Sequence, residues 1–193
     1  MSASGKLWLT LSILLALGAI IGWLVPAASW DWQPNHATAQ PWRWWTAAFV
    51  HWSPLHLGAN LVGLCLVALL GRLSAVPAVI GLAWLASWPL THLALLARPE
   101  LAHYGGLSGV LHGGVAVVAT WLVATQRGRR HGIGWALLAG LLTKVLLEAP
   151  WGAVLQNPAA WDIAVAPLAH ATGAISGLGC ALVALARGPG RRA

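Results

Sequence analysis

A serine and a histidine occupy glycine-rich positions inside two strongly apolar runs of the sequence. Ser108 stands in Gly106-Leu107-Ser108-Gly109, and His170 is followed by Gly173 and Gly177. Polar side chains within membrane segments are energetically costly and usually serve a function. Because a serine hydroxyl activated by an imidazole base is a nucleophile for acyl transfer, the pair predicts a serine hydrolase that works inside a lipid bilayer.

Ser108 is expected in the first turn of a helix that begins after Gly105 and Gly106. The free N–H groups and the dipole at a helix start favour negative charge, so an oxyanion formed there would be stabilised. A structural interpretation is also open, in which the hydroxyl bonds back to a carbonyl and Gly109-x-x-x-Gly113 only packs helices. A G-x-S-G string by itself does not decide between the two.

Two further polar residues, His56 and Asn60, lie four positions apart near the start of another apolar run. Ser53 is a suitable N-cap and Pro54 suits the first helical position, which places both side chains on one helix face. Either residue alone would be read as a group bonded to water or to a loop at the interface. As a pair directed toward Ser108, they indicate a functional role.

His170, Gly173 and Gly177 share one helix face, which is complementary to the small-residue face of Gly109-x-x-x-Gly113. Packing on these faces would bring His170 to Ser108 as a nucleophile and its base. No carboxylate stands at an obvious spacing to orient His170, because Asp162 lies eight residues earlier. The sequence therefore predicts a Ser–His dyad, with a histidine that only bonds across helices as the structural alternative.

The composition indicates an all-α polytopic membrane protein. Of 193 residues, 59% are hydrophobic and 8% are charged, against about 25% charged in a soluble domain, and the mean hydropathy is +0.73. The net charge of +7 comes from short clusters between apolar segments, which set topology and do not form a nucleic-acid-binding face. We predict one transmembrane domain over residues 1–193 and no nucleic-acid partner.

Six apolar segments approach the roughly 20 residues that a membrane-spanning helix needs. The first resembles a cleaved signal peptide, but its apolar core exceeds the roughly 7–15 residues typical of those, so we interpret it as a true span. The predicted spans are Leu7–Val25, Pro54–Leu73, Pro77–Ala97, Gly106–Thr125, Ile133–Leu147 and Ile163–Ala186.

Charge and tryptophan positions predict that both termini face the cytoplasm. Basic residues are enriched on the cytoplasmic side of membrane proteins, and indoles favour the interfaces. With the N-terminus inside, the outer loops hold only Arg43 and Arg98, together with the four acidic residues and most tryptophans. The basic residues of the inner side are Lys6, Arg72, Arg127, Arg129, Arg130, Arg187, Arg191 and Arg192.

Three strings, taken in order, resemble the signature of the rhomboid family of intramembrane serine proteases. They are Arg43-Trp44-Trp45-Thr46-Ala47-Ala48-Phe49-Val50-His51 followed by His56 and Asn60, Gly106-Leu107-Ser108-Gly109, and Ala169-His170-x-x-Gly173-x-x-x-Gly177. The resemblance implies a six-helix core whose site opens to the outer face through water. It also implies that Ser108 is the nucleophile, that His170 is the base, and that His56 and Asn60 form the oxyanion hole with the Ser108 N–H.

The sequence departs from many rhomboids at His112, where the family often has an aromatic residue that stacks on the base. The string G-L-S-G-V-L-H-G, with Lys144 and Glu148, resembles the rhombosortase branch. Those proteins are associated with substrates that carry a C-terminal Gly-Gly motif, an apolar helix and a basic tail. Lys144 and Glu148 also have the spacing of an i,i+4 ion pair that offsets burial.

The expected function is therefore intramembrane cleavage of the C-terminal transmembrane anchor of exported proteins, in a bacterial inner membrane with the site facing the periplasm. We expect no cofactor and no metal, and the partners are the bilayer and membrane-anchored substrates. The alternatives are a general rhomboid protease and a membrane protein whose paired histidines ligate haem. Hydrolysis needs a wet pocket, which we predict to be lined by His51, His56, Asn60, Ser108, His112 and His170.

Overall fold

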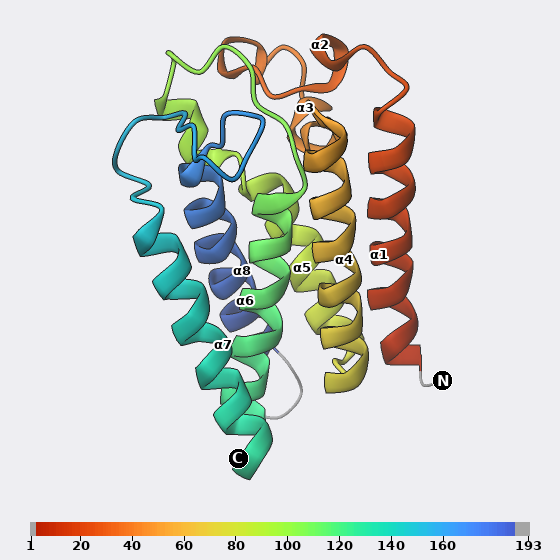
Figure 1. Cartoon of the computed structure of the whole chain (residues 1–193). Helices are drawn as coiled ribbons and strands as arrows, with labels where there is room; N and C mark the ends of the chain where they lie inside the picture. The colour runs from red at the N-terminus through yellow and green to blue at the C-terminus, as the bar shows by residue number, and fades with distance from the viewer. Residues whose placement is uncertain (1–2, 188–193) are drawn as a thin grey trace.

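Long helices run side by side through the computed structural model, which describes residues 3–187 (Figure 1). The described residues form no β-strand, only two isolated bridges, so the prediction of an all-α protein is confirmed. The long helices are α1 (Ala3–Gly22), α4 (Pro54–Ser74), α5 (Ala78–Leu90), α6 (Ser108–Thr125), α7 (Gly128–Leu147) and α8 (Pro167–Arg187).

Five segments of the described chain are long and apolar enough to cross a membrane: α1, α4, α6, α8, and α5 continued through the 3-10 helix η3 (Leu93–Ala97). The sequence predicted a sixth span over 133–147. Helix α7, which contains this segment, is not apolar enough to be counted with these five. Its 20 residues include Arg129, Arg130 and Lys144, which lower the hydropathy of the helix. The helix nevertheless runs beside α6 in the bundle (Figure 1).

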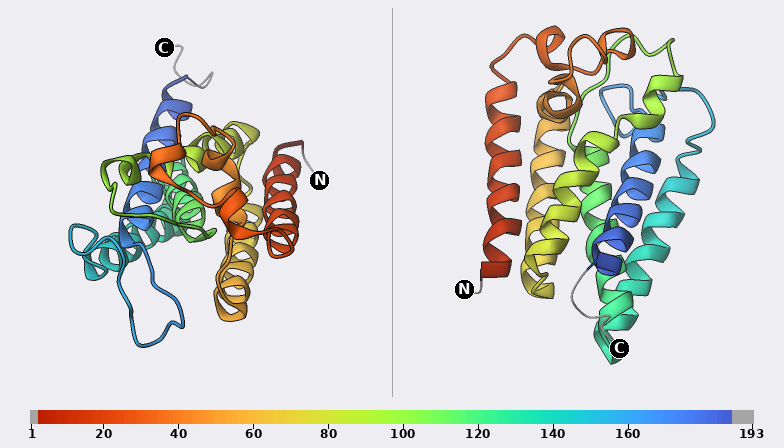
Figure 2. Two further views of the ribbon diagram at one scale, coloured as in Figure 1. Left: turned by 90° about the horizontal axis from the view of Figure 1, so that it is seen from above. Right: turned by 180° about the vertical axis from the view of Figure 1, so that it is seen from behind.

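Helix α6 is the centre of the bundle and packs against α4, α5, α7 and α8 (Figure 2). Most of its side chains are buried, from Gly109 through Leu122. Neighbours can come close because Gly109, Gly113 and Gly114 present no side chain to them. Ser108 is the first residue of this central helix, so the packing of α6 fixes its place in the interior.

Helix α1 begins and α8 ends at the same end of the bundle (Figure 1). Arg191 and Arg192, which contributed to the charge argument, lie outside the described residues. The opposite end holds the segment between α1 and α4, which contains the short helices α2 (Ala27–Trp30), η1 (Pro34–His36), α3 (Arg43–Thr46) and η2 (Ala47–Phe49).

Contacts of Asp31 and Trp32 hold this segment to the chain that leads into α6. Asp31 is fully buried and accepts hydrogen bonds from Arg43 at 2.9 Å and from His103. Trp32 and Tyr104 exchange backbone hydrogen bonds of 2.7 and 3.0 Å. These contacts fix the path of the chain just before Gly105 and therefore help to position Ser108.

Helices α6 and α8 pack directly on their glycine faces, as the sequence predicted. A Cβ on Gly173 would lie 2.0 Å from the carbonyl oxygen of Gly109, and one on Gly177 would lie 2.4 Å from that of Gly113. Real Cβ atoms do not approach a carbonyl oxygen so closely, so only glycine permits this separation. The two helices therefore depend on these glycines to bring the start of α8 beside the start of α6.

We expect Gly173→Ala to lower the stability of the fold by about 1–3 kcal/mol, as overpacking of a tight core does. It should also slow labelling of Ser108 by a fluorophosphonate, because the added methyl group pushes α8 away from α6. Thermal unfolding in detergent and the labelling rate measure the two effects. Gly179→Ala in the same helix is the matched control, since a Cβ there meets nothing within 4 Å. Equal melting and labelling of the two variants would contradict the packing argument.

Candidate active site

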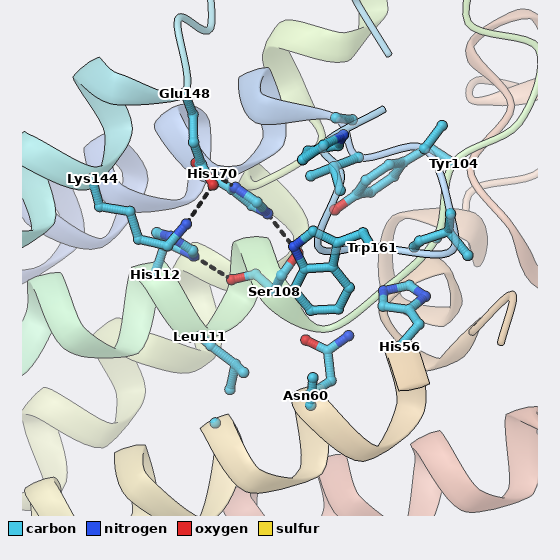
Figure 3. A pocket seen from close by; sticks show the side chains of 18 of the residues that line it. His56, Asn60, Tyr104, Ser108, Leu111, His112, Lys144, Glu148, Trp161 and His170 are labelled. Atoms are coloured by element: carbon cyan, nitrogen blue, oxygen red, sulfur yellow. Dashed lines mark hydrogen bonds and ion pairs between the residues drawn. The ribbon is translucent and has the colours of Figure 1, made fainter. Parts of the chain in front are cut away.

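Ser108 and His170 are in hydrogen-bonding contact in the first turns of α6 and α8 (Figure 3). The Ser108 Oγ lies 2.8 Å from the His170 Nε2, and the imidazole is only 5% exposed. The serine is the first residue of its helix, and the histidine lies in the first turn of α8, which begins at Pro167. The glycine contacts between the two helices bring these two first turns together.

The other ring nitrogen of His170 faces a carboxylate. Its Nδ1 lies 2.7 Å from the Glu148 Oε2, and Glu148 is the C-cap residue that follows the last residue of α7. The spacing along the sequence did not reveal this carboxylate as a partner of His170. Asp162, the only carboxylate weighed for that place, instead accepts a hydrogen bond of 2.7 Å from the Ser53 hydroxyl.

Glu148 also pairs with Lys144 one helical turn earlier, as the i,i+4 spacing predicted. Partial burial would raise the pKa of the Glu148 carboxyl, but the hydrogen bond from His170 and the Lys144 ammonium together lower this pKa to about 2. The carboxylate is therefore ionised at neutral pH. As an anion it accepts the Nδ1–H of His170 and leaves the Nε2 lone pair for the Ser108 hydroxyl proton.

His112 stacks on His170 with the two rings nearly parallel. The ring centroids are 4.4 Å apart at an interplanar angle of 6°. The His112 Nδ1 lies 2.6 Å from the Ser108 carbonyl oxygen and must donate to it, since a carbonyl only accepts. The ring therefore lies where the resemblance expected an aromatic partner of the base.

His56 and Asn60 lie beside the glycine turn that precedes Ser108. Gly106 has a φ of +131°, and a Cβ there would lie 2.7 Å from the His56 Nε2 and 3.7 Å from the Asn60 Nδ2. Only glycine suits this backbone conformation and this close approach. The site therefore combines two side chains that can donate hydrogen bonds with the first N–H groups of α6, which have no carbonyl one turn earlier.

The hydrogen bonds around His56 indicate which ring nitrogen carries the proton. The backbone N–H of Trp52 approaches the His56 Nδ1 at 3.4 Å, so Nδ1 accepts and Nε2 carries the hydrogen in the neutral ring. His51 packs against the same ring, with centroids 4.8 Å apart. Burial lowers the pKa of His51 to about 4, although its hydrogen bond to Phe49 opposes the shift. The His51 ring is therefore neutral at pH 7 and leaves His56 without a cationic neighbour there.

Tyr104 is a site residue that the sequence did not single out. Its hydroxyl is buried, has no well-formed hydrogen bond, and is directed toward Ser108 (Figure 3). Burial raises the pKa of this phenol, and the neighbouring Ser108 hydroxyl opposes the shift. Tyr104 is therefore protonated at neutral pH. The sequence held no signal for it except its place two residues before Gly106.

These side chains line a cavity of about 1150 Å³. Five of the six residues predicted to line a wet pocket do so, namely His56, Asn60, Ser108, His112 and His170. The sixth, His51, does not line it, because it packs against His56. Below the polar residues the cavity continues along apolar side chains of α4, α6 and α7, among them Leu66, Leu111, Val115, Leu137 and Leu141.

His112, Glu148 and His170 also have potential metal-ligand atoms within 4.8 Å of one another. An imidazole lone pair lies in the plane of its ring, and these two rings are parallel and stacked. Their lone pairs therefore cannot converge on one ion at the roughly 2.0–2.1 Å that a zinc–nitrogen bond requires. The arrangement fits a chain of hydrogen bonds better than a metal centre.

Among known protein families, the family model described as the Rhomboid domain matches residues 38–187 of the chain, which include every site residue described above. No curated protein matches the chain.

Proposed function

Because the chain belongs to the rhomboid family, whose members are intramembrane serine proteases, we propose that Ser108 is its nucleophile and His170 its general base. We propose further that it cleaves the C-terminal anchor of exported proteins at or near a Gly-Gly pair. The observation that carries the first proposal is the 2.8 Å contact between the Ser108 Oγ and the His170 Nε2. The haem-binding alternative is set aside, since the family is a family of peptidases.

In the proposed reaction the Ser108 Oγ attacks the carbonyl carbon of the scissile peptide bond. Its proton moves to the His170 Nε2, and the carbonyl oxygen becomes an oxyanion. The His56 Nε2–H, the Asn60 amide and the Ser108 N–H stabilise that oxyanion. The C–N bond then breaks as His170 returns the proton to the leaving amine, and water releases the acyl group from Ser108 by the same steps.

The shape of the cavity supports a membrane-anchored substrate. The apolar part of the cavity is lined by side chains of α4, α6 and α7 and offers a path for an apolar helix. Ser108 lies at the polar end of the cavity. A peptide bond must leave the helical conformation before a serine can attack it. Glycine weakens a helix by about 1 kcal/mol per residue relative to alanine, so a Gly-Gly pair at the top of the substrate helix would unwind readily.

The charge distribution supports an outward-facing site. Helices α6 and α8 begin, and α7 ends, in the half of the bundle opposite the start of α1 and the end of α8 (Figure 1). Ser108, His170 and Glu148 lie at these helix ends. If the basic residues at the end where α1 begins face the cytoplasm, the site faces the periplasm of a bacterial inner membrane. The substrates would then be proteins that have already been exported.

We expect the protein to cleave a co-expressed reporter that ends in Gly-Gly, an apolar helix and a basic tail. Replacement of the two glycines by leucine should stop the cleavage, because the helix no longer unwinds and the leucine side chains crowd the approach beside Gly106. Immunoblotting of the released reporter measures the reaction. The matched control is the same reporter with Ser108→Ala protease, which should leave it intact.

The outcomes separate the two functions that remain open. Processing of both reporters would support a general rhomboid protease of broader specificity and overturn the Gly-Gly proposal. Failure to process either reporter, with Ser108 still labelled by a fluorophosphonate, would reject this class of substrate and keep the nucleophile.

A further inference from the structure

We propose that Glu148 and Lys144 are positioning residues that extend the Ser108–His170 pair into a hydrogen-bonded chain of four side chains. This inference rests on the proposed function, because it concerns the same nucleophile and base. Each link is a direct contact, from the Lys144 ammonium to Glu148, from Glu148 to the His170 Nδ1 at 2.7 Å, and from the His170 Nε2 to Ser108 at 2.8 Å (Figure 3).

The two carboxylate oxygens of Glu148 have separate partners. Oε1 accepts from Lys144 and Oε2 accepts from His170. An i,i+4 pair that only offset the cost of a charge near the membrane would need Lys144 alone. The second oxygen instead reaches a different helix and meets the ring nitrogen opposite the one that faces Ser108.

Close packing of helices does not force this second contact. Helix α7 packs along α6 and touches α8 only sparsely. Glu148 reaches His170 because α7 ends there, with Ala149 in the left-handed region at a φ of +46°, a conformation that is uncommon for any residue but glycine. The Gln156 side chain donates to the Glu148 carbonyl oxygen at 3.1 Å, and the Gln156 backbone pairs with Val165 just before α8. The end of α7 is thus attached to the segment that leads into His170.

The contact assigns two tasks to Glu148. By accepting the Nδ1–H, it fixes the tautomer whose Nε2 can take the serine proton. Its negative charge also stabilises the imidazolium that forms when that proton arrives, and the carboxylate itself remains ionised. Lys144 opposes the second task, since its positive charge offsets part of the carboxylate charge.

Lys144 and Glu148 therefore act on the protonation of His170 in opposite directions. Besides Lys144 and Glu148, the titratable side chains that line the cavity with His170 are His112 on α6, His56 on α4, and Asp31, His103 and Tyr104 in the loops. Helix α5, which also packs against α8, carries no titratable side chain. None of these groups changes in the variants proposed below, so shifts in the pH profile can be assigned to the altered residue.

The experiment measures the rate at which a fluorophosphonate labels Ser108 as a function of pH, with the full chain in detergent. Replacement of the buried aspartate of a Ser–His–Asp triad by asparagine costs about 10⁴ in rate, and we expect about 10²-fold for Glu148→Gln because water reaches this carboxylate. The acidic limb of the pH–rate profile of Glu148→Gln should move to lower pH, since the neutral amide no longer favours the imidazolium form of His170. Glu148→Asp should keep the acidic limb near the pH at which it lies in the wild type. Its labelling rate should lie between those of Glu148→Gln and the wild type.

Lys144→Ala should move the acidic limb to higher pH, the opposite direction, because it leaves the carboxylate uncompensated. Glu100→Gln is the matched control, since Glu100 is an exposed carboxylate paired with Arg98 away from the site, and it should leave the profile unchanged. The inference would be overturned if the acidic limb stayed in place in both variants, or if it moved in the same direction in Glu148→Gln and Lys144→Ala. If Ser108→Ala still carried the label, the proposed function itself would fail, which is a separate result.

Discussion

His170→Ala is expected to abolish peptide cleavage and the fluorophosphonate labelling of Ser108 together. A serine hydroxyl is a weak nucleophile until a base takes its proton, and the His170 Nε2 lies 2.8 Å from the Ser108 Oγ, where it can do so. In serine proteases the loss of the nucleophile or the base alone costs about 10⁶ in kcat. We expect a loss of that order for both Ser108→Ala and His170→Ala, which is complete in practice.

Cleavage of the reporter in membranes and labelling by the probe measure the two losses. The matched control is His36→Ala, because His36 is an exposed histidine of the segment between α1 and α4 whose side chain contacts Gln33. This control should retain full activity and labelling. Labelling of His170→Ala at the rate of the wild type would show that the base lies elsewhere.

His56→Ala and Asn60→Ala are each expected to lower kcat by about 10²–10³-fold, the usual effect of losing one oxyanion donor. KM should change little, because the donors stabilise a charge that exists only after the attack. Both residues lie beside Gly106 and are nearly buried, so their donors meet the oxyanion in a site with little competing water.

Steady-state cleavage of the reporter in detergent gives kcat and KM for each variant. Gly58→Ala is the matched control, since it lies between these residues on α4 and a Cβ there meets nothing within 4 Å. Thermal unfolding verifies that the variants are folded. A normal kcat in either variant would remove that residue from the oxyanion hole.

The sequence by itself determined the class of the protein and predicted the contact between Ser108 and His170, the proposed nucleophile and base. Its uninterrupted apolar runs of roughly 20 residues indicated helices in a bilayer, because a helix satisfies its backbone hydrogen bonds within its own segment. The helical period placed His56 with Asn60 and His170 with Gly173 on single faces, since residues three and four apart are neighbours on a helix. The two small-residue faces then predicted the contact of α6 with α8 that joins Ser108 to His170.

Only the tertiary structure decided which carboxylate serves His170. The periodicity of a helix specifies neighbours within one helix, so it paired Glu148 with Lys144 and left its second oxygen without a partner. The contact with His170 spans 22 residues and crosses from α7 to α8. It depends on where α7 stops and on how the chain between the helices folds, through Ala149 and Gln156. Those features follow from packing among distant segments, which spacing along a sequence does not record.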